Sequence, residues 1–183
     1  MTSAETPVHV SFPRRIGGAL GLAPEVFRDI ERDPRALVQA AAVVVAAGAA
    51  RGIGAFSDEG RAGLVGSAVV AVATWLLAGT LIWLVGVKRF ACRSELPEVL
   101  RTLGFAAAPL LLLALGALPL GPAHPWLWVG AHVWATLALA VATREALDVG
   151  VHRALAVCVL ALAVGFALLA LMGVLVAKWG AFD

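Results

Sequence analysis

Five long apolar segments, separated by short polar ones, dominate the chain at about residues 36–56, 64–87, 103–118, 127–143 and 154–177. Because an apolar helix of about 20 residues crosses the ~30 Å hydrocarbon core of a bilayer, each segment is a candidate transmembrane helix. The first segment is the weakest, since Arg51 interrupts it and must extend its side chain to the membrane surface. The pattern predicts an all-α polytopic membrane protein with five transmembrane helices.

The composition strengthens this interpretation, because 61% of the 183 residues are hydrophobic, 14% are charged and the mean hydropathy is +0.93. An ordinary soluble domain contains about 25% charged residues. The net charge is only +2, and the basic residues gather at the ends of the apolar segments, which argues against nucleic acid as a partner. The two cysteines, Cys92 and Cys158, are too few for a disulfide framework and are expected to be free thiols.

The residues ahead of the first apolar segment fall into two parts. Residues 1–23 show no helical periodicity, so we expect a flexible cytoplasmic tail. The stretch PEVFRDIERDP, residues 24–34, places Phe27 and Ile30 on one helical face and charged residues on the other. It predicts a short interfacial amphipathic helix with Phe27 among acyl chains, and the alternative is a helix packed against the protein's own loops. Residues 24–183 would then form a single membrane domain.

The basic residues also predict the orientation, because cytoplasmic loops carry an excess of Lys and Arg. With a cytoplasmic N-terminus, the five predicted spans place eleven of the fourteen Lys and Arg residues inside and leave Arg51, Arg61 and Lys178 outside. The C-terminus would lie outside, and the membrane would be the cell plasma or inner membrane. The eleven inside residues are Arg14, Arg15, Arg28, Arg32, Arg35, Lys88, Arg89, Arg93, Arg101, Arg144 and Arg153.

The charged connection between the second and third apolar segments is a candidate binding surface. Lys88 and Arg89 end the second segment, and Arg93 follows before the third begins. Clusters of cations beside a membrane span attract anionic lipid and acidic partners. These three residues, together with Phe27 of the predicted interfacial helix, therefore form a candidate partner or lipid surface.

Three polar side chains within the apolar segments, Gln39, Thr74 and His132, form a candidate intramembrane polar site. Ionisable groups within a span are functional candidates, which draws attention to His132. Since no carboxylate lies in a span, structural hydrogen bonding of His132 is the stronger interpretation, with a proton or ligand role as the alternative. The sequence contains no HExxH, paired CxxC or nucleophile elbow, so it predicts no metal site, no cofactor and no enzymatic activity.

Small residues and a proline predict how the helices pack. Gly48 and Gly52 are four residues apart, a spacing that favours close approach of a neighbouring helix. Pro109 lies within the third apolar segment and removes a backbone hydrogen bond, which predicts a kink.

The run Gly104-Phe105-Ala106-Ala107-Ala108-Pro109 consists of a glycine, an aromatic residue, three further residues and a proline. Together with PEVFRDIERDP, LVGVKRF and WATLALAVATREALDVGVHRALAV, it resembles the Yip family, integral membrane proteins named for interaction with Ypt/Rab GTPases. The resemblance covers about residues 24–172 and implies five spans with a cytoplasmic N-terminus. The Asp-Leu-Tyr-Gly-Pro motif of the eukaryotic trafficking members is absent and the chain has no tyrosine, so the resemblance points to the bacterial branch and Rab binding is not carried over.

These patterns together predict a non-enzymatic membrane protein that organises the membrane or recruits a partner as a scaffold. Its expected partners are the lipid bilayer, another membrane or cytoplasmic protein, and a second copy of the chain in a homo-oligomer. The alternative is a component of a small-solute or ion transporter or channel. A helix broken at Pro109 is compatible with transport, although the spans contain no acidic residue.

Overall fold

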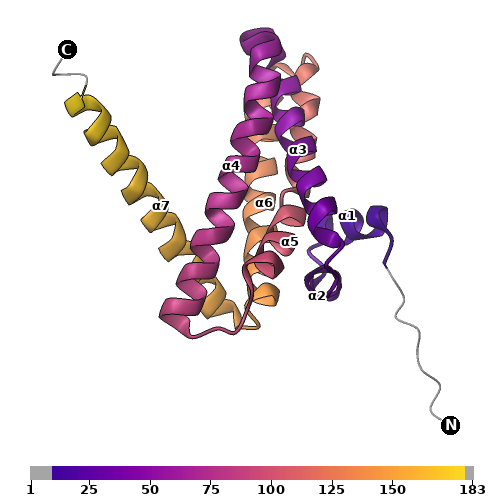
Figure 1. Cartoon of the computed structure of the whole chain (residues 1–183). Helices are drawn as coiled ribbons and strands as arrows, with labels where there is room; N and C mark the ends of the chain where they lie inside the picture. Colours follow the sequence, from indigo (N-terminus) through magenta and orange to yellow (C-terminus); the bar gives the residue numbers. More distant parts are fainter. Residues whose placement is uncertain (1–9, 180–183) are drawn as a thin grey trace.

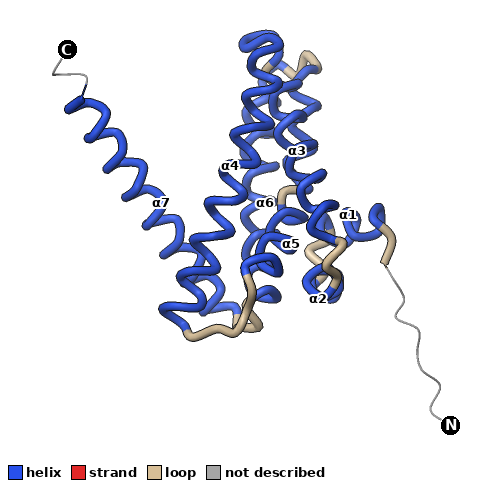
Figure 2. Tube along the Cα trace, viewed as in Figure 1, coloured by secondary structure: helices blue, strands red, loops and turns tan. Residues whose placement is uncertain are grey.

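The computed structural model describes residues 10–179, with the side chains of residues 56–62, 166 and 168–179 outside the description. Within that range the chain is helical and contains no strand (Figure 2). The long helices follow the predicted apolar segments, as expected where an apolar face must be buried or face lipid. In chain order the elements are α1 (Phe12–Leu20), α2 (Pro24–Arg32), α3 (Ala36–Gly54), α4 (Phe56–Phe90), α5 (Leu96–Ala106), η1 (Ala108–Ala117), η2 (Gly121–Ala123), α6 (His124–Ala146) and α7 (Val151–Trp179).

Four helical stretches are long and apolar enough to cross a membrane, at Ala36–Gly54, Gly63–Phe90, Leu96–Ala117 and Gly121–Ala146. They confirm a multi-pass membrane protein and correspond to the first four predicted spans. The third stretch begins about two turns earlier than the predicted 103–118, because α5 runs directly into the 3₁₀ helix η1. The predicted fifth span, 154–177, falls on α7, whose described apolar part is the shorter Val151–Gly165. A fifth crossing therefore stays a prediction.

Helices α3, α4, α5, η1 and α6 pack side by side into a bundle (Figure 1). Small residues fill its interior, including Ala40, Ala106 and Ala138, each at most 3% exposed. Large aliphatic residues face outward instead, such as Val69 on α4 and Val133 on α6. In hydrocarbon, burying a leucine between helices gives no hydrophobic free energy, because lipid tails are equally apolar. Small residues that let the helix backbones pack closely therefore hold the helices together.

Glycines mark the points of closest approach between α3 and α4. A Cβ added to Gly48 would lie 2.7 Å from the Cα of Ala68, and one added to Gly52 would lie 2.7 Å from the Cα of Leu64. Real Cβ atoms do not come so near to backbone, so only glycine fits these positions. The predicted close packing at this glycine pair is confirmed.

The expected flexible tail, residues 1–23, is helical over part of its length, and residues 1–9 of that prediction lie outside the described residues. Residues 12–20 form helix α1, which packs with α2 against α5 (Figure 1). The ring of Phe12 lies edge-on to Phe105 of α5, with 6.1 Å between ring centroids, and the indole N–H of Trp134 on α6 donates to the carbonyl of Leu20 at 2.9 Å. The prolines and glycines of this stretch suggested irregular chain, but Pro13 occupies the first turn of α1, where its missing N–H costs nothing.

Helix α7 leaves the bundle. Its N-terminal part packs against α4 and α6, and its C-terminal end points away from them (Figure 1). Val157 and Ala161 are buried where α7 meets the bundle, whereas Val159 and Leu162 on the opposite face are more than half exposed. Helix α7 is therefore bound to the other helices through one end.

Candidate functional site

A buried arginine joins the first three helices. Arg15 of α1 is 1% exposed, and its guanidinium donates to the carboxylates of Asp29 on α2 and of Asp33 at the C-terminal cap of α2, at 2.9 and 2.8 Å. A third donor reaches the side-chain oxygen of Gln39 on α3 at 2.9 Å. Burying a charge is costly unless it is paired, and this cluster supplies both opposite charge and hydrogen bonds. Gln39 therefore belongs to a structural cluster and does not join the other predicted intramembrane polar residues.

A second ion pair, in which only the carboxylate is buried, connects α2 to the end of α6. Glu145 is 7% exposed and accepts from Arg28 of α2 at 2.6 Å and from its neighbour Arg144 at 2.7 Å. Nearby, the guanidinium of Arg101 on α5 donates to the backbone carbonyl of Glu31. These contacts hold α2 against the bundle. The charges involved therefore have a structural function, whereas the sequence alone shows them only as charged residues between apolar segments.

Phe27 is placed differently from the prediction. Its side chain is fully buried in the hydrophobic core, together with Ile30, because α2 turns its apolar face toward α5 and α6. The apolar face that predicted lipid contact is thus satisfied within the protein, which was the alternative interpretation. Phe27 cannot serve as a lipid or partner surface in this arrangement.

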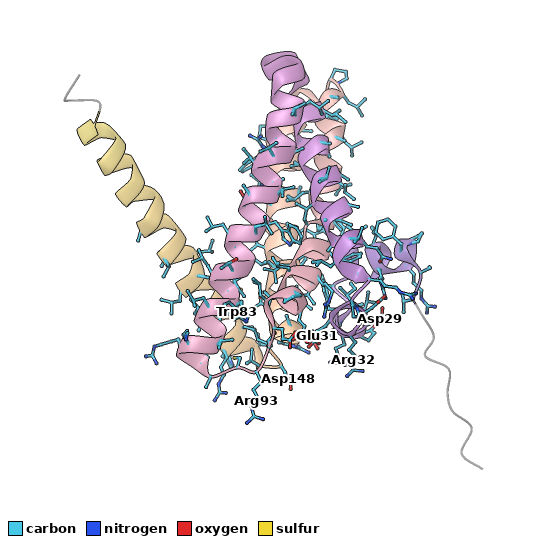
Figure 3. All side chains as sticks on the ribbon, in the orientation of Figure 1. Asp29, Glu31, Arg32, Trp83, Arg93 and Asp148 are labelled. Carbon is cyan, nitrogen blue, oxygen red and sulfur yellow. The ribbon has the colours of Figure 1, made fainter. Side chains whose placement is uncertain are left out.

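The other three residues of that predicted surface are exposed. Lys88 and Arg89 lie at the end of α4, Arg93 lies in the connection to α5, and none of the three forms an ion pair with a described residue. Figure 3 shows Arg93 projecting away from the bundle. The capping box of α5, in which Glu95 and Glu98 satisfy each other's backbone N–H groups, fixes where this connection ends.

Arg153 adds a fourth cation that the sequence did not single out. Burial raises the pKa of the Cys92 thiol, and the nearby charge of Arg153 partly lowers that pKa again. Arg153 therefore lies near the α4–α5 connection, although it comes from the start of α7. We call Lys88, Arg89, Arg93 and Arg153 the basic elbow surface.

Carboxylates gather beside this surface at the same end of the bundle, where Figure 3 shows Glu31 and Asp148. Burial raises the pKa of Glu31 above its ordinary value of 4.5, and the charges of Glu98 and Asp148 raise this pKa further. The positive charges of Arg32 and Arg101 oppose the shift without cancelling it. The ionised form of Glu31 is thus disfavoured in the folded protein.

Replacing Glu31 by glutamine is expected to raise the melting temperature at pH 7. The pKa of Glu31 is higher in the folded protein than in the unfolded chain, where it is near 4.5. Stability therefore falls as the pH rises from the unfolded-state pKa to the folded-state pKa, and the loss is complete above the folded-state pKa. The difference between Glu31→Gln and the unmodified protein should therefore shrink as pH falls below 4.5. Thermal unfolding of the detergent-solubilised chain at pH 4 and pH 7 measures this, with exposed Glu25→Gln as control. A lower melting temperature for Glu31→Gln at pH 7 would contradict the prediction.

The Gly104–Pro109 run contains the point where α5 crosses α3 and the point where the α-helix gives way to a 3₁₀ helix. Gly104 faces α3 so closely that an added Cβ would lie 2.6 Å from the Cβ of Ala40. Phe105 is fully buried, and α5 ends at Ala106. Pro109 sits in the first turn of η1, where a 3₁₀ helix replaces the α-helix. Where the sequence predicted a kink at Pro109, the structure shows a switch from α to 3₁₀ geometry.

Two of the predicted intramembrane polar residues meet in one cavity. Thr74 of α4 and His132 of α6 both line a cavity of about 560 Å³ between α3, α4, η1 and α6. The Nδ1 atom of His132 lies 2.8 Å from the carbonyl oxygen of Trp128, and its ring stacks on the Trp128 indole with 4.0 Å between centroids. A carbonyl oxygen only accepts, so Nδ1 carries the proton. His132 is thus held by its own helix.

Helices with apolar outer faces, small residues inside and charges collected at their ends define a multi-pass α-helical membrane protein. The sequence matches the Yip1 domain over residues 18–172, which includes α2 through most of α7 and both halves of the Gly104–Pro109 run. The chain therefore belongs to the Yip1 domain family, as its motifs indicated. Neither the curated proteins nor the solved structures contain a significant match to it.

Proposed function

We propose that this Yip1 domain protein is a non-enzymatic membrane scaffold that recruits an acidic partner through the basic elbow surface. The observation that carries the proposal is the exposure of Lys88, Arg89 and Arg93 beside the end of a membrane helix, without an ion-pair partner among the described residues. Two charged residues of the neighbouring α2 behave differently. Arg28 and Asp29 are used internally, in ion pairs with Glu145 and Arg15.

The proposal places the elbow in the cytoplasm of a bacterial cell, with the protein in its inner membrane. Support comes from the clustering of positive charge, because the basic elbow surface and Arg28, Arg32 and Arg144 gather at the same end of the bundle. Basic residues near short loops remain on the cytoplasmic side during insertion. A cytoplasmic N-terminus follows, since α2 lies at that end.

Neutralising the elbow should weaken capture of cytoplasmic partners at least tenfold while insertion stays normal. A cation near a surface of opposite charge contributes about 1 kcal/mol, so three glutamines at positions 88, 89 and 93 remove enough attraction for that loss even after screening by salt. In-cell crosslinking from the elbow, with quantitation of captured proteins, measures the effect. The matched control replaces the exposed Arg14, Arg32 and Arg35 by glutamine, which changes the net charge equally. Equal capture by both triple variants would rule out the elbow as the recruiting surface.

The second candidate function is a component of a small-solute or ion transporter or channel. The observation in its favour is the cavity that brings Thr74 and His132 together within the membrane helices. Most other lining side chains are aliphatic, such as Val44, Leu110 and Leu139, and an ion path needs polar groups to replace water. Flux of ions or small solutes into liposomes that contain the purified chain distinguishes this function from the scaffold.

A further inference from the structure

Arg51 provides an exposed positive charge at the end of the bundle opposite the basic elbow surface. It lies in the last turn of α3 and lines the cavity that contains Thr74 and His132. It also lines an adjoining cavity of about 320 Å³ together with His124 and Trp128. One guanidinium nitrogen donates to the hydroxyl of the buried Ser67 at 3.1 Å. No carboxylate among the described residues pairs with Arg51.

The larger cavity is a groove with a closed floor and a lateral mouth. Its floor consists of buried residues from α3 and α5, including Ala47 at 3% and Leu103 at 4% exposure. Its mouth lies between α4 and α6, where Val70 is 60% exposed and Thr136 is also exposed. A cavity of about 560 Å³ with mainly apolar walls and a few polar groups has the size and character of a small-molecule site. Because the mouth opens on the lipid-facing side, its occupant would enter from the bilayer.

The depth of the groove matches one leaflet of a bilayer. Along α4 its lining runs from Ser67 to Ala78, which at 1.5 Å per residue is about 16 Å. Half of the ~30 Å hydrocarbon core is about 15 Å. The shallow end carries Arg51 and, in the adjoining cavity, Trp128, and indole rings favour the headgroup level of a membrane. An acyl chain in the groove would thus place its headgroup at Arg51.

We propose that this groove binds one phospholipid with an anionic headgroup, with its phosphate on Arg51 and an acyl chain along Thr74 and Trp75. A guanidinium offers donors in a planar fork that fits phosphate, and among the described residues Ser67 is the one side chain to which Arg51 donates. The aliphatic side chains of the floor then contact the acyl chain in place of the neighbouring lipids that would surround it in the bilayer. The site is separate from the basic elbow surface, so a test of lipid binding here is independent of a test of the proposed recruiting function.

Native mass spectrometry of the full chain, purified in detergent with equal amounts of phosphatidylglycerol and phosphatidylcholine, tests the proposal. We expect one retained phosphatidylglycerol per chain, and Arg51→Gln should lower its retention at least tenfold. Ala135→Phe places a ring in the groove and should lower the retention of both lipids. Arg14→Gln removes an exposed charge on α1, outside both the groove and the basic elbow surface, and should leave retention unchanged.

Several results would overturn the proposal. Equal retention of both lipids by the unmodified chain and by Arg51→Gln would show that the headgroup charge is not recognised. Loss of the bound lipid on adding inorganic phosphate alone would show that the acyl chain contributes nothing. A lipid-free dimer would show that a second copy occupies the groove, and a lipid-free monomer would show that the groove binds no lipid. Circular dichroism of each variant confirms that a lost lipid does not reflect a lost fold.

Discussion

Replacing Arg15 by methionine is expected to lower the free energy of unfolding by about 3 kcal/mol, at the lower end of the range for breaking a buried ion pair. The substitution keeps a long apolar stem but removes the charge between Asp29 and Asp33. Asp29 is 27% exposed and recovers some hydration, which places the expected cost toward that lower end. Thermal or denaturant unfolding of the detergent-solubilised chain measures the loss.

Two further variants separate this effect from a general sensitivity of α1. Arg14→Met changes the exposed neighbour of Arg15 and should have an effect within about 0.5 kcal/mol. Adding Asp29→Asn and Asp33→Asn to Arg15→Met should recover part of the stability, because a buried amide is less costly than a buried carboxylate that has lost its ion pair with Arg15. If Arg15→Met is as stable as Arg14→Met, the cluster does not hold α1 in place.

Replacing Gly104 by leucine is expected to lower the free energy of unfolding by about 3 kcal/mol, the upper end of the cost of overpacking a core. The Cα and carbonyl carbon of Ala40 lie 3.1 Å from the place of the new Cβ, so α3 and α5 must separate. The same detergent-solubilised unfolding measurement applies. Loss of this crossing would also widen the floor of the groove, to which Leu103 and Ala106 contribute.

Gly130→Leu is the matched control for this substitution. Gly130 also lies within a long helix, α6, but an added Cβ would meet no atom within 4 Å. Glycine weakens a helix by about 1 kcal/mol relative to good helix formers, so Gly130→Leu should leave stability unchanged or raise it slightly. Similar losses for both variants would show that the cost comes from the leucine side chain and not from the crossing at Ala40.

Hydrophobic pattern alone predicted the membrane class and the first four spans, because each long apolar run must be helical to satisfy its backbone in lipid. Boundaries were less accurate where helices continue beyond the apolar stretch, as in α5, whose first turn carries the charged capping box. The folded part of residues 1–23 was missed, because α1 is too short for a clear period and its stability comes from contacts with α2 and α5.

The candidate site residues were predicted to different degrees. Exposed cations such as Lys88 and Arg93 are recognisable because their position after an apolar run determines where they lie. Phe27 was misplaced, because an amphipathic face does not reveal whether lipid or protein covers it. Asp29 lies on α2 and Asp33 is the residue that caps its C-terminus, but nothing in the sequence identified Arg15 as the cation that pairs with both.

The contacts of α1 and α2 also determine the order of assembly during synthesis. Arg28 and Glu145 are separated by 117 residues, and Leu20 and Trp134 by 114. At a ribosomal rate of about 5–20 residues per second, the N-terminal helices wait roughly 6 to 23 seconds before α6 emerges. Docking of the N-terminal helices is therefore complete only after α6 is made, and a chain truncated ahead of α6 lacks these two contacts while keeping those to α3 and α5.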